Sequence, residues 1–181
     1  MAAQATIYRF LVALSDVDRQ VYESLDLRVA CHPSETLRYL LTRTLAYALS
    51  YEDGIAFSKG GLSQTEEPPI AVRERTGVLR AWIDVGAPSA DRLHKATKAA
   101  DRVSIFTHSD LTLLRREAAA RAIHKVETIE VWRIDQALLD AMEPKIDRHT
   151  SMDVMRNDGQ LYVTIDGVTL DGAITRGTLV E

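Results

Sequence analysis

A strand–helix–strand pattern in the middle of the chain restricts the possible folds more than any other feature. The run Val78–Val85 is apolar and strand-like, Gly86–Ser89 forms a turn, and an amphipathic segment then extends to about Arg102. The buried-looking run Val103–Thr107 follows. Two strands joined by a helix are expected to be parallel neighbours in one sheet, with a right-handed crossover. The sheet should therefore contain at least one parallel pair.

Antiparallel hairpins are expected on both sides of this unit. Near the N-terminus, Val21–Cys31 alternates between apolar and polar residues, and it follows the β-rich run Ala5–Leu14 after a short polar turn. Near the C-terminus, Asn157–Gly159 and Asp166–Gly167 are hairpin turn signals between strand-like runs. The sequence therefore predicts a mixed α+β fold, with an N-terminal hairpin and a C-terminal antiparallel meander around a mixed sheet flanked by helices.

A further helix and two short strands are expected between the first hairpin and the central unit. The helix is predicted to open at His32–Glu35, with Pro33 in its first position and Glu35 in its first turn. Strand-like runs follow at Ile55–Ser58 and Ile70–Arg73. The predicted order in this part of the chain is therefore helix, three strands, helix and strand.

Composition predicts one domain and excludes several classes of protein. A chain of 181 residues that is 46% hydrophobic and 27% charged is expected to fold as a single domain over residues 1–181. Its net charge of −4 excludes a strongly cationic coat. The lone Cys31 excludes an intrachain disulfide and a zinc site built on cysteines. Without an apolar run of about 20 residues or a nucleotide-binding fingerprint, we expect a cytoplasmic protein that binds neither membrane nor nucleotide cofactor.

Two acidic residues are candidates for a metal site. Asp84 lies at the C-terminal end of the predicted central strand, the edge at which open sheets with crossover helices bind ligands. Glu67 lies just before the preceding strand, in a loop that two prolines stiffen. If the two strands are neighbours, the two carboxylates can come together and bind Mg²⁺ or Mn²⁺, which prefer oxygen ligands.

Basic residues on the following helix can complete such a site. Lys95 or Arg92 can act as the catalytic cation, because either can neutralise a phosphate oxygen or a charge that develops during hydrolysis. With Lys95 in that role, Arg92 and Lys98 are expected to contact nucleic-acid phosphates. An ordinary structural interpretation is also open: Asp84 can accept hydrogen bonds from the Gly86 or Ala87 amides or pair with Arg80 or Lys95, and a basic stripe on a helix is usually a solvated face.

Several stretches of the chain resemble the YaeQ family of small bacterial proteins. They extend over nearly the whole sequence, and their combination is specific to that family. The matching stretches are Ala5–Tyr8, His32–Thr36, Glu66–Pro68, Trp82–Gly86 with Pro88, and Arg92–Ala96.

The resemblance implies a variation on the PD-(D/E)XK nuclease-like fold, whose core has the order αβββαβ. Glu67 would correspond to the first acidic residue of that motif and Asp84 to the second, so that both would bind the metal. An acidic residue on the first helix can join the metal site, which implicates Glu35. Gly86 occupies the position of the motif's lysine. Lys95, on the following helix, is expected to supply the cation in its place.

Two functions are open at this point. The first is a divalent-metal-dependent phosphodiesterase or nuclease-like enzyme that acts on nucleic acid. The second is a non-catalytic regulatory protein that binds nucleic acid or a protein partner on the same scaffold. The enzyme requires Glu67 and Asp84 to bind one metal ion with Lys95 beside it, whereas the binding protein does not.

Overall fold

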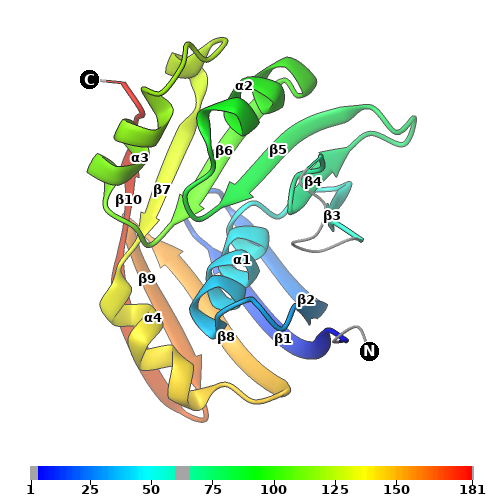
Figure 1. Cartoon of the computed structure of the whole chain (residues 1–181). Helices are drawn as coiled ribbons and strands as arrows, with labels where there is room; N and C mark the ends of the chain where they lie inside the picture. Colours follow the sequence, from blue (N-terminus) through cyan, green and yellow to red (C-terminus); the bar gives the residue numbers. More distant parts are fainter. Residues whose placement is uncertain (1–3, 60–65, 181) are drawn as a thin grey trace. The chain divides into compact units, whose positions relative to one another are not determined.

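Two compact units make up the chain. The computed structural model describes residues 4–59 and 66–180 (Figure 1), and these residues form two units, each with many contacts within itself. The first unit comprises the residues up to Tyr51 together with Ile134–Ile174. The second comprises Glu52–Arg133 and the residues from Thr175 onward. The first unit is therefore built from two segments that are far apart in the sequence.

The first unit contains a five-stranded sheet. Its strands, in spatial order, are β2 (Val21–Cys31), β1 (Thr6–Asp16), β8 (His149–Asn157), β9 (Gln160–Ile165) and β10 (Val168–Gly177). β1 is antiparallel to β2 and parallel to β8, whereas β8, β9 and β10 form an antiparallel meander. The N-terminal hairpin and the C-terminal meander expected from the sequence are therefore confirmed.

A buried ion pair connects β1 to β8. The register places Asp16 opposite Arg156, whose Nε lies 3.0 Å from Asp16 Oδ1 and whose Nη2 lies 2.6 Å from Asp16 Oδ2. The Asp16 side chain is fully buried and that of Arg156 is 5% exposed. Short-range sequence patterns do not predict this parallel pair, because the two residues are 140 positions apart.

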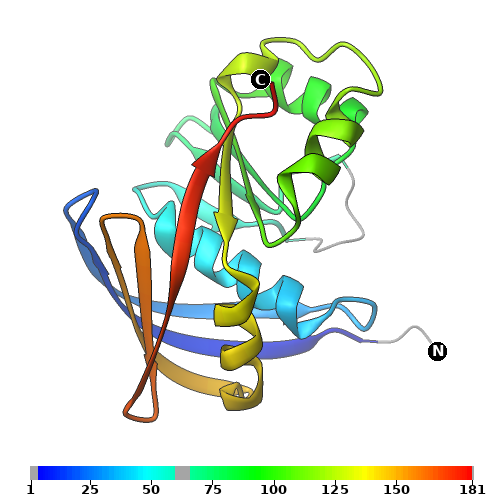
Figure 2. The ribbon, with the colours of Figure 1, turned by 90° about the vertical axis from the view of Figure 1, so that its left-hand side faces the viewer.

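Helices α1 (Leu37–Leu49) and α4 (Gln136–Met142) pack against each other on one face of this sheet (Figures 1 and 2). Thr36 is the N-cap of α1, and its hydroxyl accepts a hydrogen bond from the Tyr39 N–H at 3.1 Å. The preceding residues His32–Glu35 form a turn. The prediction that this segment opens the helix is wrong by about one turn, because Thr36 caps the free N–H groups.

The second unit contains a mixed sheet. Its strands, in spatial order, are β7 (Glu130–Ile134), β6 (Arg102–Thr107), β5 (Leu79–Val85), β4 (Ile70–Arg73) and β3 (Ile55–Phe57). β5, β6 and β7 are parallel, and β3, β4 and β5 are antiparallel. Helix α2 (Ala90–Ala99) connects β5 to β6. The predicted parallel pair with a crossover helix is therefore confirmed, although α2 ends a few residues before Arg102 because Ala100 is extended.

The core of the second unit lies between this sheet and helices α2 and α3 (Leu111–Ala118). Trp82 on β5, Leu93 on α2, Ile105 on β6 and Leu114 on α3 are each at most 2% exposed. Leu93 and Ala96 reach this core together because they recur at helical spacing. Their burial fixes α2 against the sheet.

The order α1, β3, β4, β5, α2 and β6 matches the order expected from the sequence, and the mixed α+β class is confirmed. α1 belongs to the first unit, however, whereas the other five elements belong to the second. A nuclease-like core built from these elements stays a prediction. None of the helices in the described part of the chain is long and apolar enough to span a membrane.

Candidate functional site

Asp84 lies near the C-terminal end of β5. The alternation of the strand places Trp82 and Asp84 on the same face of the sheet, and Asp84 is only 3% exposed. The chain then turns at Gly86, whose φ of 86° suits glycine. Ser89 caps α2 by accepting a hydrogen bond from the Arg92 N–H at 3.2 Å. This sequence of turn and cap places the first turn of α2 beside the end of β5.

The Asp84 carboxylate is bound by groups of its own unit. Its Oδ2 accepts hydrogen bonds from Arg92 Nε at 2.7 Å and from Trp82 Nε1 at 3.0 Å. Its Oδ1 accepts one from the Val85 N–H at 3.2 Å. The Arg92 guanidinium also lies 5.4 Å from the centre of the Trp82 ring, within range of a cation–π interaction. Both carboxylate oxygens therefore have protein donors.

Arg92 connects the end of β5 to the loop that precedes β4. Its Nη2 donates a hydrogen bond to the main-chain carbonyl of Glu67 at 2.9 Å. Glu67 thus contributes its carbonyl to this network, while the residue as a whole is exposed. The structure brings the Glu67 segment and Asp84 together through Arg92.

Lys95 pairs with Glu66 on the same loop. Its ammonium group forms an ion pair with the Glu66 carboxylate, and the two side chains are 43% and 80% exposed. Arg80, which the sequence offered as a partner of Asp84, instead pairs with Glu74 and Asp101. Arg80 and Lys95, the two basic residues that the sequence suggests as partners of Asp84, therefore pair with other residues.

Lys98 lines a small cavity near the C-terminal end of α2. The cavity has a volume of about 300 Å³, and His124 and Lys125 also line it. Asp101, an acidic residue of its lining, accepts a hydrogen bond of 2.6 Å from Arg80 Nη1, and this ion pair neutralises its charge. These contacts leave the cavity with a cationic lining.

The pKa of His94, another residue of α2, reflects the positive charge in this region. Its Nδ1 accepts a hydrogen bond from the His124 N–H at 3.1 Å. Burial lowers the pKa of His94, and the nearby cations Arg121 and Lys98 lower it further. The neutral imidazole is therefore favoured, as expected in a region of positive potential.

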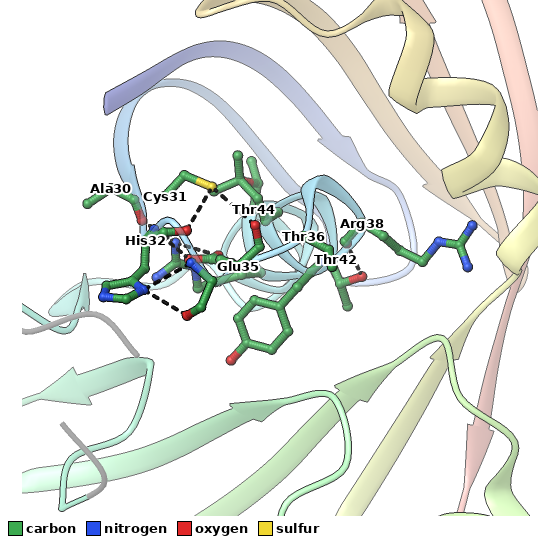
Figure 3. Close-up of polar contacts among 12 residues, drawn as sticks. Ala30, Cys31, His32, Glu35, Thr36, Arg38, Thr42 and Thr44 are labelled. Atoms are coloured by element: carbon green, nitrogen blue, oxygen red, sulfur yellow. Dashed lines mark hydrogen bonds and ion pairs between the residues drawn. The ribbon is translucent and has the colours of Figure 1, made fainter. Parts of the chain in front are cut away.

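Glu35 lies in the first unit, in the turn before α1. Figure 3 shows Cys31, His32 and Glu35 together at the start of this helix. The Glu35 side chain is fully buried, and its Oε1 lies 2.9 Å from Arg43 Nη2. Its Oε2 accepts a hydrogen bond from the His32 N–H at 3.2 Å. Burial raises the pKa of Glu35, although Arg43 opposes the rise.

Two of the three predicted metal ligands, Asp84 and Glu35, thus pair with arginines. Glu35 belongs to a different unit from Glu67 and Asp84 and is paired with Arg43. Within residues 4–59 and 66–180, no group of three or more His, Cys, Asp and Glu side chains could hold a metal ion. The carboxylate of Asp84 is a suitable donor for Mg²⁺ or Mn²⁺ by its chemistry, but a cation bound at its Oδ2 would compete with the Arg92 guanidinium.

The contact between Asp84 and Arg92 is not among those expected from the sequence. Asp84 was expected to bind a metal ion, and Arg92 to contact phosphates. Arg92 is the third residue of α2, and long side chains on a helix lean toward its N-terminus. The sequence did contain a signal for this ion pair: an acidic residue at the end of a strand, followed by a basic residue in the first turn of the next helix.

A family model described as YaeQ protein matches residues 1–173 of the chain. The YaeQ protein of Escherichia coli strain K12 is 27% identical over 177 residues, which are 97% of each chain. The YaeQ protein of Salmonella typhi is 28% identical over 165 residues, which are 91% of each chain.

Two crystal structures of YaeQ proteins resemble the fold. The protein from Xanthomonas axonopodis pv. citri superposes with a TM-score of 0.86 at 29% identity, over 96% of this chain and 98% of that one. The protein from Pseudomonas syringae superposes with a TM-score of 0.85 at 30% identity, over 96% of each chain. The family model and these similarities establish that this chain belongs to the YaeQ family.

Proposed function

We propose that this protein is a non-catalytic nucleic-acid-binding protein whose second unit recognises phosphate groups without a metal ion. The observation that carries the proposal is the contact of Asp84 with Arg92 and Trp82. It makes Asp84 a positioning group for an arginine, and arginine is well suited to phosphate recognition because its planar guanidinium can donate several hydrogen bonds.

The energetic cost of opening each ion pair supports binding over metal-dependent catalysis. The Asp84 and Arg92 side chains are 4% and 21% exposed, so a metal ion at Asp84 would separate a largely buried pair and leave Arg92 uncompensated. Lys95 and Glu66 are far more exposed, and such pairs contribute at most about 1 kcal/mol. A phosphate can therefore displace Glu66 from Lys95 more readily than a metal can displace Arg92 from Asp84.

The distribution of basic residues also favours the second unit. α2 carries Arg92, Lys95 and Lys98 at every third position. Lys98 lines the same cavity as His124 and Lys125. By sequence, the first unit holds eight basic and thirteen acidic side chains, which leaves fourteen and thirteen of the 22 and 26 for the second. An acidic first unit repels phosphates, so nucleic acid should bind the second.

Binding can be measured by fluorescence anisotropy with labelled single- and double-stranded oligonucleotides, in the presence of EDTA. We expect the wild-type protein to bind at low salt and the oligonucleotide to stay intact. The variant K95A/K98A should bind at least about tenfold more weakly, because it loses two phosphate contacts. Its matched control is R116A/R176A, which removes two exposed positive charges from the same unit.

Three results would contradict this proposal. They are no binding by the wild-type protein at low salt, equal losses in the two double variants, and binding that requires Mg²⁺ or Mn²⁺. Equal losses of affinity would mean that binding depends only on the net charge of the unit and not on the positions of Lys95 and Lys98.

A second candidate function is metal-dependent phosphodiester hydrolysis on a nuclease-like scaffold, with Glu67 and Asp84 as metal ligands and Lys95 as the catalytic cation. One observation favours it: contacts of Arg92 and Lys95 hold the Glu66–Glu67 segment near the C-terminal end of β5. This is the edge at which the family resemblance implies a metal site.

Calorimetric titration of Mn²⁺ distinguishes the two functions. A saturable heat in the wild-type protein that D84N abolishes, together with cleavage that K95A abolishes, would support the hydrolase. R92Q sharpens the test, because removal of the guanidinium should strengthen metal binding if Asp84 is a ligand. Equal heats in the wild-type protein, D84N and R92Q would eliminate Asp84 as a metal ligand.

A further inference from the structure

The sheet of the first unit has a hollow on its outer face. The hollow has a volume of about 610 Å³ and runs across β2, β1, β8 and the turn after β9. The outward-facing side chains that shape it belong to Leu11, Ala13, Ser24, Asp26, Ser151 and Asp153. Neighbouring lining residues such as Val12 and Met152 are buried and contribute their side chains to the opposite face.

The strand register explains why the sheet is hollowed at this place. One row across the strands consists of Asp26, Leu11 and Ser151, and the next consists of Ser24, Ala13 and Asp153. Three of these six side chains are small, and they occupy neighbouring positions on three adjacent strands. A gap therefore opens between the larger side chains of the two rows.

The charge of the hollow is negative. Asp26, Asp153 and Asp166 line it, and none of the described lining residues is a lysine or an arginine. Arg9 binds Asp26 through two hydrogen bonds of 2.9 and 2.8 Å, which neutralises that carboxylate. Asp153 and Asp166 carry the remaining charge, within a unit in which acidic residues outnumber basic ones. The electrostatic complement of this surface is a cation.

Exposed apolar side chains extend along the same face beyond the hollow. Ile7 and Leu11 on β1 are 54% and 43% exposed, and Met155 on β8 is 38% exposed. The outward row between Ile7 and Leu11 consists of Arg28, Arg9 and His149, so Ile7 is separated from the hollow, whereas Met155 lies in the row next to Asp153. Within the described part of the first unit, α1 and α4 pack against the opposite face. Leu11 in the hollow and Met155 beside it are therefore exposed apolar residues on one face, and grouped residues of this kind mark interaction surfaces.

We infer that this outer face docks a segment of a partner protein that carries lysine or arginine next to aliphatic side chains. The basic group would pair with Asp153 and Asp166, and the aliphatic groups would cover Leu11 and the hollow. A polypeptide fits better than a small cation, because the exposed apolar residues extend past the hollow itself. This inference concerns the first unit and does not depend on the proposed nucleic-acid binding by the second.

A synthetic peptide of alternating leucine and lysine residues is the probe, and its binding to the full-length protein can be measured by calorimetry. We expect D153N/D166N to weaken binding by about tenfold, because it removes the unpaired charges of the hollow. S151L should weaken binding to a similar extent, because it fills the hollow without changing the charge. The matched control D147N/D158N removes two exposed acidic residues of the same unit and should leave binding nearly unchanged.

Circular dichroism and thermal unfolding establish that each variant is folded before binding is compared. The inference is overturned if the wild-type protein does not bind the peptide, or if both double variants weaken binding equally. Normal binding by S151L also contradicts it, since the peptide would then not use the hollow. Spermidine is the last probe. If spermidine binds as tightly as the peptide and displaces the peptide, the surface is a site for small cations and the inference is overturned.

Discussion

At the residue scale, the partners of Asp84 determine its chemistry. A carboxylate whose two oxygens accept hydrogen bonds from Arg92, Trp82 and the Val85 N–H is well solvated by the protein itself. It has little need of a metal ion to balance its charge, because the guanidinium already does so. The orientation of Arg92 in turn depends on Asp84, so the two residues should behave as one energetic group.

The substitution R92A tests this dependence. It leaves the buried Asp84 carboxylate without its cationic partner, and we expect the free energy of unfolding to fall by about 2–4 kcal/mol. Urea denaturation provides the measurement. The control R80A removes an arginine whose two ion pairs are exposed, and it should have a much smaller effect. Similar losses in the two variants would contradict the prediction.

The buried carboxyl group of Glu35 should make stability depend on pH. Burial raises its pKa in the folded protein, so between the unfolded and folded pKa values the folded state retains a proton that the unfolded chain has released. The stability that this group contributes is therefore fully present below the unfolded pKa and is lost as the pH rises through the folded pKa.

The variant E35Q removes this titration. The free energy of unfolding of the wild-type protein, relative to that of E35Q, should fall as the pH rises above the ordinary pKa of a glutamate. Urea denaturation at a series of pH values measures this difference. A difference that is constant or grows with pH would show that Glu35 does not titrate in this way.

At the scale of elements, β1 illustrates which parts of the fold are readable from the sequence. The pairing of β1 with β2 follows from alternation and a short turn. The parallel pairing of β1 with β8 has no local signal, because β8 is encoded far along the chain. The hairpin of β9 and β10, in contrast, is signalled by Asp166–Gly167, where both residues have the positive φ that suits a tight turn. The start of α1 was misplaced because Thr36 and the residues before it are all acceptable near a helix start.

The ion pair between β1 and β8 supports a prediction with an internal control. R156A removes the closer partner of the fully buried Asp16 and leaves the more distant Arg19, whose Nη1 lies 3.5 Å from Asp16 Oδ2, so we expect the free energy of unfolding to fall by about 3 kcal/mol. R9A breaks the similar two-bond contact with Asp26, but that pair is exposed to solvent and its loss should have little effect. Chemical denaturation compares the two variants. An effect of R9A as large as that of R156A would show that burial does not determine the contribution of such a pair.

The candidate functional site was partly predictable for the same reason as the elements. The rule that ligands bind at the C-terminal ends of strands led to Asp84, and the loop that carries Glu66 and Glu67 does lie near it. The pairing of each side chain was not predictable, since several arginines and lysines were within plausible reach in the sequence. Only the packed structure selects Arg92 for Asp84, and Glu66 for Lys95.

At the scale of the whole molecule, the two units are interleaved along the chain. The first unit needs both its N-terminal segment and Ile134–Ile174, because the second segment supplies β8, β9, most of β10 and α4. Without that segment, β1 and β2 keep only the packing of α1 and lose three further strands and α4, and a two-stranded hairpin is at best marginally stable in water.

A chain that ends after Arg133 should therefore lack a folded first unit. We expect NMR spectra in which residues 6–31 have the poorly dispersed amide shifts of an unfolded segment, with no cooperative unfolding for that region. The full-length protein provides the control. A truncated chain whose β1 and β2 residues keep dispersed shifts would contradict the prediction.

The parallel pairing of β1 with β8 also has a consequence for protein synthesis. A ribosome makes the chain from its N-terminus, so β1 and Asp16 emerge long before Arg156 exists. During that interval, β1 lacks its neighbour β8 and the Asp16 carboxylate lacks Arg156, and unpaired strand edges promote aggregation. Nascent chains of this protein should therefore depend on chaperones until the last quarter of the sequence has been translated.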